Sequence, residues 1–368
     1  MIKYLFFLSF IFTITFCFGQ SINDTNSVLD KANIALDNGN YDEAIELYKK
    51  SLSENKDIAK INLNISTIYA LKGDFNEALV YIKKALETNP DYSQAYNNAG
   101  SSNAILGNYE IAVLNFFKAM ETNPNDFKSF YNMGRLYFDV KDYNATIYNM
   151  NKAIQINDSC IECYNTIGSS YINKNNLAKA LENFNKALIR DNKNITALNN
   201  IGIIYKMKKD LNNSIKYFEK AEKIKPDDYY IKSNLGYIYL EKEQYNKAIG
   251  YLQYAYTLNK DNDIAFNLAV AFESINDTTS AMSYYNQIIK NDNSYALAYY
   301  NLGLLYFKLK SYNKSLDYLS NAINSDPSLY YAYYIIGYLY EMAGDLEKAN
   351  YNKSIAYKLN PSLQLIKE

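Results

Sequence analysis

The chain has 368 residues, a formal net charge of −1, no histidine and no tryptophan. Without histidine, it lacks the commonest general base and the commonest protein ligand of zinc. Lysine and arginine are spread without a dense basic block, which argues against a general nucleic-acid-binding surface. We therefore predict a chain that is not an enzyme and that binds no cofactor, no metal ion and no nucleic acid.

Residues 1–19 have the pattern of a secretory signal peptide. Lys3 supplies a positive start, and an almost unbroken apolar and aromatic run follows from Tyr4 to Phe18. Small residues at Cys17 and Gly19 predict cleavage after Gly19, with a short polar linker at residues 20–24. The expected mature protein is periplasmic or secreted, and it includes no further stretch long and apolar enough to span a bilayer.

Two other interpretations of this segment stay open. An uncleaved segment would act as an N-terminal membrane anchor. Alternatively, Cys17 would be the lipidated residue of a bacterial lipoprotein, although Phe16 stands where that signal has a small residue. All three interpretations predict export, and they allow a place in a complex of the cell envelope.

Proline and glycine recur at fixed positions of a 34-residue period. Because both residues impose particular backbone geometries, their confinement to fixed phases indicates one backbone unit repeated along the chain. The prolines share one phase: Pro90, Pro124, Pro226, Pro327 and Pro361. Seven glycines mark a second phase (Gly100, Gly134, Gly168, Gly202, Gly236, Gly303, Gly337), and four mark a third (Gly39, Gly73, Gly107, Gly344).

The period predicts ten units over residues 25–363, followed by a tail at residues 364–368. The units begin near residues 25, 59, 93, 127, 161, 195, 229, 262, 296 and 330. Within a unit, small and bulky apolar residues recur three or four positions apart, which places them on one helical face. We therefore expect two helices in each unit and an all-α fold, with glycine at the second phase allowing close helix contact.

A turn with Gly or Lys followed by Asp or Asn separates the two helices of a unit. The acidic or amide residue stands where the second helix needs an N-cap, a side chain that accepts a free backbone N–H. The expected caps are Asn40, Asp74, Asn108, Asp142, Asn176, Asp210, Asp277 and Asp345.

The order of small, aromatic, alanine and proline positions resembles that of the tetratricopeptide repeat family over about nine-tenths of the sequence. The third unit shows it with Gly100, Ala112, Phe116, Ala119 and Pro124. The resemblance implies a right-handed superhelical solenoid, whose first helices line a concave groove that binds proteins or peptides.

An asparagine recurs six residues into most units, on the helix expected to line the groove. These residues are Asn64, Asn98, Asn132, Asn200, Asn234, Asn267 and Asn301. An amide side chain offers donors and an acceptor, so such a ladder can pair with the backbone of an extended peptide. Alternatively, the same amides bond a neighbouring repeat or their own helix, or they reflect an asparagine-rich composition.

Other groove positions change in character along the chain. The middle offers the polar residues Asn97, Ser101, Asn165, Ser169 and Asn199. The C-terminal third offers the aromatic residues Tyr230, Tyr237, Phe266, Tyr300, Phe307, Tyr331, Tyr334 and Tyr338. Tyrosine combines broad contact area with a polar tip, which suits an interface; core packing and stacking on a glycan are the alternatives.

Cys160 and Cys163 form the one conspicuous motif outside the repeat pattern. In an exported protein this spacing allows a short-range disulfide, and two free thiols are the alternative. A zinc site would need carboxylates as its further ligands, and redox catalysis would need a thioredoxin-like setting.

These patterns favour a protein that binds another protein or an extended peptide in its concave groove. The alternative function is a structural scaffold of an envelope or secretion assembly that uses the convex face or the edges. A helical-repeat RNA reader is a poorer match, because it needs a longer unit and a basic groove.

Overall fold

The computed structural model describes residues 27–54 and 57–363 of the chain. The predicted signal peptide, linker and tail lie outside these residues. Within them the secondary structure is helical throughout, as the sequence predicts, and no helix of this part is long and apolar enough to cross a membrane.

The helices belong to two units, residues 1–190 and residues 191–368, which are described separately. Unit 1 contains α1 (Val28–Asp37), α2 (Tyr41–Ser51), the short η1 (Leu52–Glu54), α3 (Ile58–Leu71), α4 (Phe75–Thr88), α5 (Ser93–Ile105), α6 (Tyr109–Thr122), α7 (Phe127–Asp139), α8 (Tyr143–Ile156), α9 (Ile161–Asn173) and α10 (Leu177–Arg190). Unit 2 contains α11 (Ile195–Met207), α12 (Leu211–Ile224), α13 (Tyr229–Glu241), α14 (Tyr245–Leu258), α15 (Asn262–Ser274), α16 (Thr278–Asn291), α17 (Ala296–Lys308), α18 (Tyr312–Ser325), α19 (Tyr330–Met342) and α20 (Leu346–Leu359).

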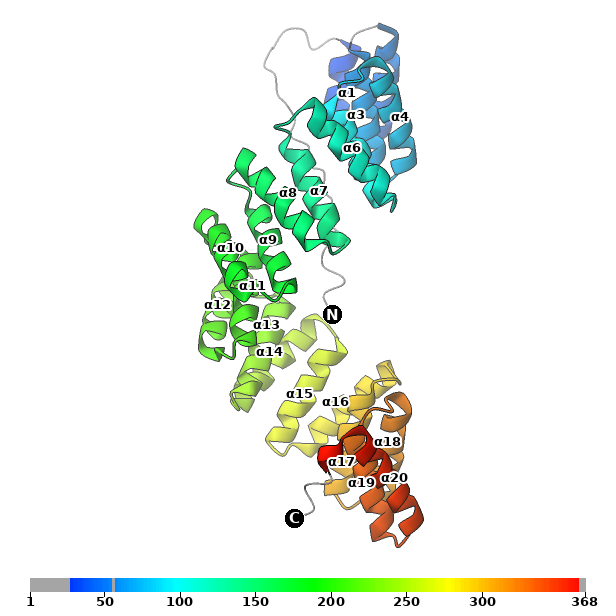
Figure 1. The fold of residues 1–368 in the computed structure, drawn as a ribbon, viewed down its shortest axis with the longest axis vertical. Helices are drawn as coiled ribbons and strands as arrows, with labels where there is room; N and C mark the ends of the chain where they lie inside the picture. The colour runs from blue at the N-terminus through cyan, green and yellow to red at the C-terminus, as the bar shows by residue number, and fades with distance from the viewer. Residues whose placement is uncertain (1–26, 55–56, 364–368) are drawn as a thin grey trace. The chain divides into compact units, whose positions relative to one another are not determined.

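Consecutive helices form hairpins, and each hairpin stacks on the next one within its unit (Figure 1). The odd-numbered helix comes first in every hairpin. First helices of successive hairpins also contact one another, α3 with α5 and α5 with α7 in unit 1, and α13 with α15 in unit 2. We call the side of unit 2 formed by α11, α13, α15, α17 and α19 the first-helix face.

Glycine at the second phase allows the two helices of a hairpin to approach closely. A β-carbon added at Gly168 would lie 2.7 Å from the ring of Phe184, and one at Gly202 would lie 2.9 Å from the ring of Phe218. Both rings are completely buried. The prediction that glycine at the second phase allows close helix contact is therefore confirmed.

The turn inside each hairpin holds one residue in the left-handed region of backbone conformation. Gly39, Gly73, Gly107 and Gly344 have φ values of 75° to 82° there. The same turn position holds Lys141, Asn175, Lys209, Glu243, Asn276 and Lys310 in other hairpins, with φ values of 56° to 65°. The backbone of the repeat thus requires this conformation even where the sequence lacks the glycine that adopts it without strain.

Six of the eight expected caps accept a backbone N–H with their side chains: Asp74, Asp142, Asn176, Asp210, Asp277 and Asp345. Asn40 and Asn108 precede α2 and α6 but make no such bond. The amide of Asn108 instead donates to Oδ1 of Asn103, 3.3 Å away in α5. Its side chain therefore bonds the preceding helix and not the first turn of α6, which it was expected to cap.

Candidate functional site

The asparagine ladder lies on first helices in both units, and all seven side chains are half-buried. Asn64, Asn98 and Asn132 belong to unit 1, on α3, α5 and α7. Asn200, Asn234, Asn267 and Asn301 belong to unit 2, on α11, α13, α15 and α17. The hydrogen bonds of six members divide them into those held by buried partners and those that bond their own helix or a lysine side chain.

Two ladder members are held by a buried tyrosine on the preceding second helix. Asn64 Nδ2 donates to the phenol oxygen of Tyr48 at 3.3 Å, and Asn301 Nδ2 donates to that of Tyr285 at 2.9 Å. Both phenol side chains are completely buried. Burial raises the pKa of Tyr48 to about 12 and raises that of Tyr285 as well, so both phenols stay neutral. These two asparagines therefore provide hydrogen-bond donors to hydroxyl groups of core residues.

Asn132 belongs to a buried polar network in unit 1. Its Nδ2 donates to Oδ1 of Asn97 at 2.9 Å, while Asn97 Nδ2 donates to the hydroxyl of Ser129 at 2.8 Å. Asn97 and Ser101 were expected to line the groove, but both are less than a tenth exposed. They face the interior between α5 and α7, where polar groups must bond one another because water is excluded.

Three members on the first-helix face of unit 2 lack such partners. Asn200 and Asn267 donate to the carbonyl oxygens of Thr196 and Asp263, one turn earlier in their own helices, at 2.8 and 2.9 Å. Asn234 accepts from Lys206 Nζ at 3.5 Å. Since an amide has two N–H donors and an oxygen with two lone pairs, each of the three retains bonding capacity toward a ligand.

The predicted aromatic set also lies on the first-helix face, spread over α13, α15, α17 and α19. Tyr230, Tyr331 and Tyr338 are exposed by 39%, 48% and 44%. The other members are half-buried: Tyr237, Phe266, Tyr300, Phe307 and Tyr334. The half-buried ring of Phe307 lies beside the exposed ring of Tyr338, with 6.0 Å between their centroids.

Some of these rings pack mainly against residues of neighbouring helices and of the core. Phe266 lies 5.8 Å from the ring of buried Tyr285, and Tyr334 lies 6.3 Å from that of Tyr357 in α20. Tyr300 packs against the core cluster around Leu319. The exposed surface of the aromatic set is therefore concentrated at Tyr230, Tyr331 and Tyr338.

A charged cluster that the sequence analysis did not identify adjoins Asn234. Lys206 Nζ lies 4.7 Å from the ring centroid of Tyr237, whose hydroxyl donates to Glu241 at 3.0 Å. Glu241 also accepts from Lys209 at 3.4 Å. Burial lowers the pKa of Lys206, although nearby Glu241 acts in the opposite direction. The cluster places both signs of charge beside an amide of the ladder.

Models of the tetratricopeptide repeat match residues 35–99, 161–194, 195–228, 233–296 and 296–329. The chain belongs to the tetratricopeptide repeat family. A comparison with curated protein sequences found no match.

Solved structures of other tetratricopeptide repeat proteins are similar to this chain. A tetratricopeptide repeat protein from Parabacteroides merdae matches with a TM-score of 0.51 and 17% identity, covering 67% of this chain and 98% of its own. YrrB, a repeat protein with an unusual peptide-binding site, matches with a TM-score of 0.43 and 24% identity, covering 50% of this chain and 95% of its own. At 17% identity, the match to the Parabacteroides merdae protein shows the fold alone.

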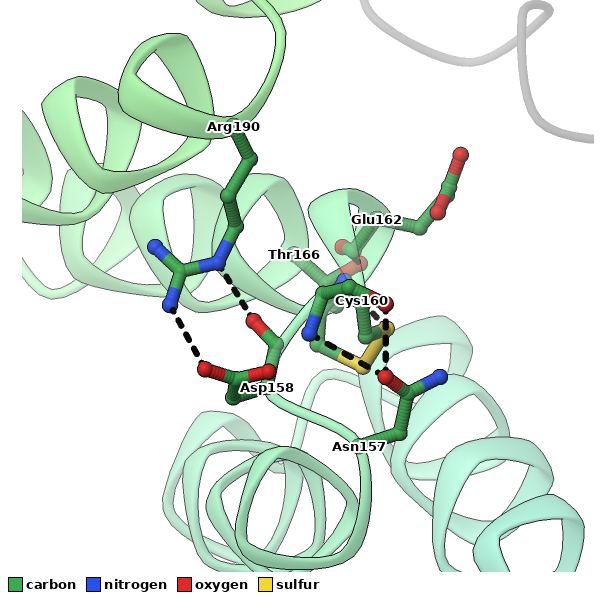
Figure 2. Close-up of a disulfide and its surroundings, with 8 residues drawn as sticks. Asn157, Asp158, Cys160, Glu162, Thr166 and Arg190 are labelled. Carbon is green, nitrogen blue, oxygen red and sulfur yellow. Dashed lines mark hydrogen bonds and ion pairs between the residues drawn. A yellow bond between two sulfur atoms is a disulfide. The ribbon is translucent and has the colours of Figure 1, made fainter.

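Cys160 and Cys163 form a disulfide at the start of α9 (Figure 2). Cys160 is the N-cap of the helix, and its sulfur accepts from the backbone N–H of Cys163 at 3.1 Å. Both residues lie in the core between α8 and α9. Because a catalytic or exchanging thiol needs exposure to its substrate, this buried bond is structural.

Arg190 fixes the link that precedes the disulfide. Its Nε donates to the carbonyl oxygen of Asp158, and its Nη2 lies 3.8 Å from the carboxylate of the same residue (Figure 2). The guanidinium also lies 4.2 Å from the ring centroid of Tyr164. A side chain of α10 thus holds the connection between α8 and α9.

The described residues include no group of three histidine, cysteine or acidic side chains able to hold a metal ion.

Proposed function

We propose that this chain is a non-enzymatic protein-interaction module that holds an extended segment of a partner protein against the first-helix face of unit 2. Membership of the tetratricopeptide repeat family supports a role in protein interaction. The specific support is the division within the ladder: Asn200, Asn234 and Asn267 retain bonding capacity, whereas Asn64 and Asn301 bond buried phenols.

The chemistry of this face suits a peptide backbone flanked by mixed side chains. Amides spaced one repeat apart bond N–H and C=O groups whatever the ligand's sequence. The exposed rings of Tyr230, Tyr331 and Tyr338 supply contact area at low entropic cost, as tyrosines do at interfaces. Lys206 and Glu241 add charges that select among partners through complementarity.

The experiment compares partner capture by two double variants. Purified wild-type chain retrieves partners from an extract of its native cells, and mass spectrometry identifies them. Asn234→Ala with Asn267→Ala is expected to reduce capture about tenfold or more, because two hydrogen-bonding side chains are lost. Thermal unfolding is expected to change little.

The matched control is Asn246→Ala with Asn286→Ala on the second helices α14 and α16. Both side chains are exposed, and Asn286 makes the same bond to a carbonyl one turn earlier as Asn267 does. The control is expected to capture partners normally. Equal capture by all three proteins would refute binding on the first-helix face and favour the scaffold alternative, in which other faces hold the partner.

The proposal places this interaction outside the cytoplasm, on the basis of the signal-like sequence of residues 1–19. Terminal sequencing of the protein from its native cells tests it. A mature chain that begins at Gln20 is expected, whereas an intact start at Met1 in a cytoplasmic fraction would contradict export.

A further inference from the structure

One second helix, α6, has an outer side unlike those of the other repeats. Ile111 and Phe117 are large apolar residues at positions that are polar or small in every other unit. The residues equivalent to Ile111 are Glu43, Glu77, Ala145, Lys179, Asn213, Lys247, Ser280, Lys314 and Lys348. Those equivalent to Phe117 are Lys49, Lys83, Asn151, Asn185, Glu219, Gln253, Asn286, Ser320 and Ser354. The repeat fold itself does not require apolar residues here.

These side chains are exposed. Ile111, Leu114 and Phe117 have exposed fractions of 49%, 61% and 48%. They lie on the side of α6 opposite its buried residues Ala112, Phe116 and Ala119. Clustered exposed apolar side chains on a soluble protein mark an interaction surface. We call Glu110, Ile111, Leu114, Phe117 and Lys118 the α6 outer face.

The α6 outer face is complementary to itself when two copies run antiparallel. Glu110 lies one helical turn before Leu114, and Lys118 lies one turn after it. A twofold axis at Leu114 brings Glu110 opposite the second copy's Lys118, and Ile111 opposite its Phe117. Leu114 then meets its own equivalent. In such an isologous contact every favourable pair away from the axis occurs twice.

We propose that the chain forms a twofold homodimer through the α6 outer face. The neighbouring second helices of unit 1, α4 and α8, extend the self-complementary surface. Val80 of α4 and Tyr148 of α8 hold the position of Leu114 in the neighbouring repeats, with exposed fractions of 45% and 61%. The same twofold axis places the Val80 side of one copy over the Tyr148 side of the other.

A cleft beside Leu114 gives the second copy's apolar side chains a place to insert. It has a volume of about 440 Å³ and is lined by Tyr109, Val113, Leu114, Leu136, Tyr137, Val140 and a single acidic residue, Glu110. The Lys118 ammonium lies 5.5 Å from the ring centroid of Tyr96 in the same unit and remains exposed, so it is available to a carboxylate of the second copy.

Charge reversal tests the antiparallel register. Sedimentation equilibrium of the purified chain, from low to high micromolar concentration, is expected to show a monomer–dimer equilibrium. Glu110→Lys and Lys118→Glu each create two like-charge contacts and are expected to weaken dimerisation about tenfold. The double variant restores both pairs in reverse and is expected to recover most of the affinity. A double variant weaker than either single variant would overturn the register.

Two further variants separate dimerisation from folding. Leu114→Glu is expected to abolish the dimer without altering circular dichroism, since Glu182 occupies the equivalent position of α10. Leu114→Cys is expected to form an intermolecular disulfide under mild oxidation, whereas Glu182→Cys at a comparable exposure is not. A monomeric wild type, or a dimer that persists in Leu114→Glu, would refute the proposal.

Discussion

Asn301 Nδ2 lies 2.9 Å from the phenol oxygen of Tyr285, sixteen residues earlier in the chain. Because the tyrosine is completely buried, Asn301→Ala removes a donor that water cannot replace, and we expect a loss of about 1–2 kcal/mol of unfolding free energy. Asn267→Ala removes only a bond within its own helix and is expected to cost less than about 0.5 kcal/mol. Urea unfolding measures both; equal costs would show that the ladder is not divided.

Lys310 has a φ of 59° in the turn before α18, where four other hairpins have glycine. Glycine adopts this conformation without steric strain from a β-carbon. Lys310→Gly is therefore expected to stabilise the chain by about 1 kcal/mol, although glycine also gives the unfolded state more conformational freedom. Lys310→Ala keeps the β-carbon and is the control, with no gain expected. Thermal unfolding compares the two, and a gain in the alanine variant would assign the effect to charge.

Phe184 fills the space opposite Gly168 and is completely buried. Phe184→Ala leaves a cavity between α9 and α10, with an expected cost of roughly 3–5 kcal/mol. Since repeats contact only their neighbours, amide exchange should quicken first around these helices. Uniform loss of protection along the whole chain would contradict nearest-neighbour stacking.

Two N-cap carboxylates make the free energy of unfolding of unit 2 depend on pH in the acid range. A hydrogen bond from the backbone N–H of Ser280 lowers the pKa of Asp277, and bonds from Asn213 lower that of Asp210. A folded-state pKa below the unfolded value of about 3.9 gives stability that is complete above that pH and lost as pH falls through the folded pKa.

Melting temperature measured from pH 6 to pH 3 is therefore expected to fall at the acid end. Asp210→Asn with Asp277→Asn keeps an amide able to cap each helix but removes the titration. The slope of melting temperature against pH should be smaller in this variant. An unchanged slope would mean that other carboxylates control acid unfolding.

The sequence was sufficient for the fold because its periodic residues act locally. Gly168 needs only a neighbouring helix with Phe184, and Asp74 caps the helix that starts at the next residue. Such relationships repeat with the backbone unit, so their spacing can be read directly from the chain.

The roles of the asparagines could not be predicted in this way. Asn64 and Asn301 differ from Asn200 because tyrosine, at Tyr48 and Tyr285, stands sixteen residues earlier, where Phe184 precedes Asn200. The sequence shows this difference as tyrosine in place of phenylalanine, which adds one hydroxyl group at a core position. The bonds of Asn132 depend on Asn97, one repeat away, and only the packing of α5 against α7 brings them together.

Site-specific photocrosslinking in the native cells tests most directly whether a partner lies on the first-helix face of unit 2. A photoreactive side chain at Tyr331 of α19 is compared with one at Tyr254 of α14, since the two residues have similar exposed fractions of 48% and 42%. We predict a crosslinked partner from Tyr331 and none from Tyr254. A partner crosslinked from Tyr254 alone would contradict binding on the first-helix face.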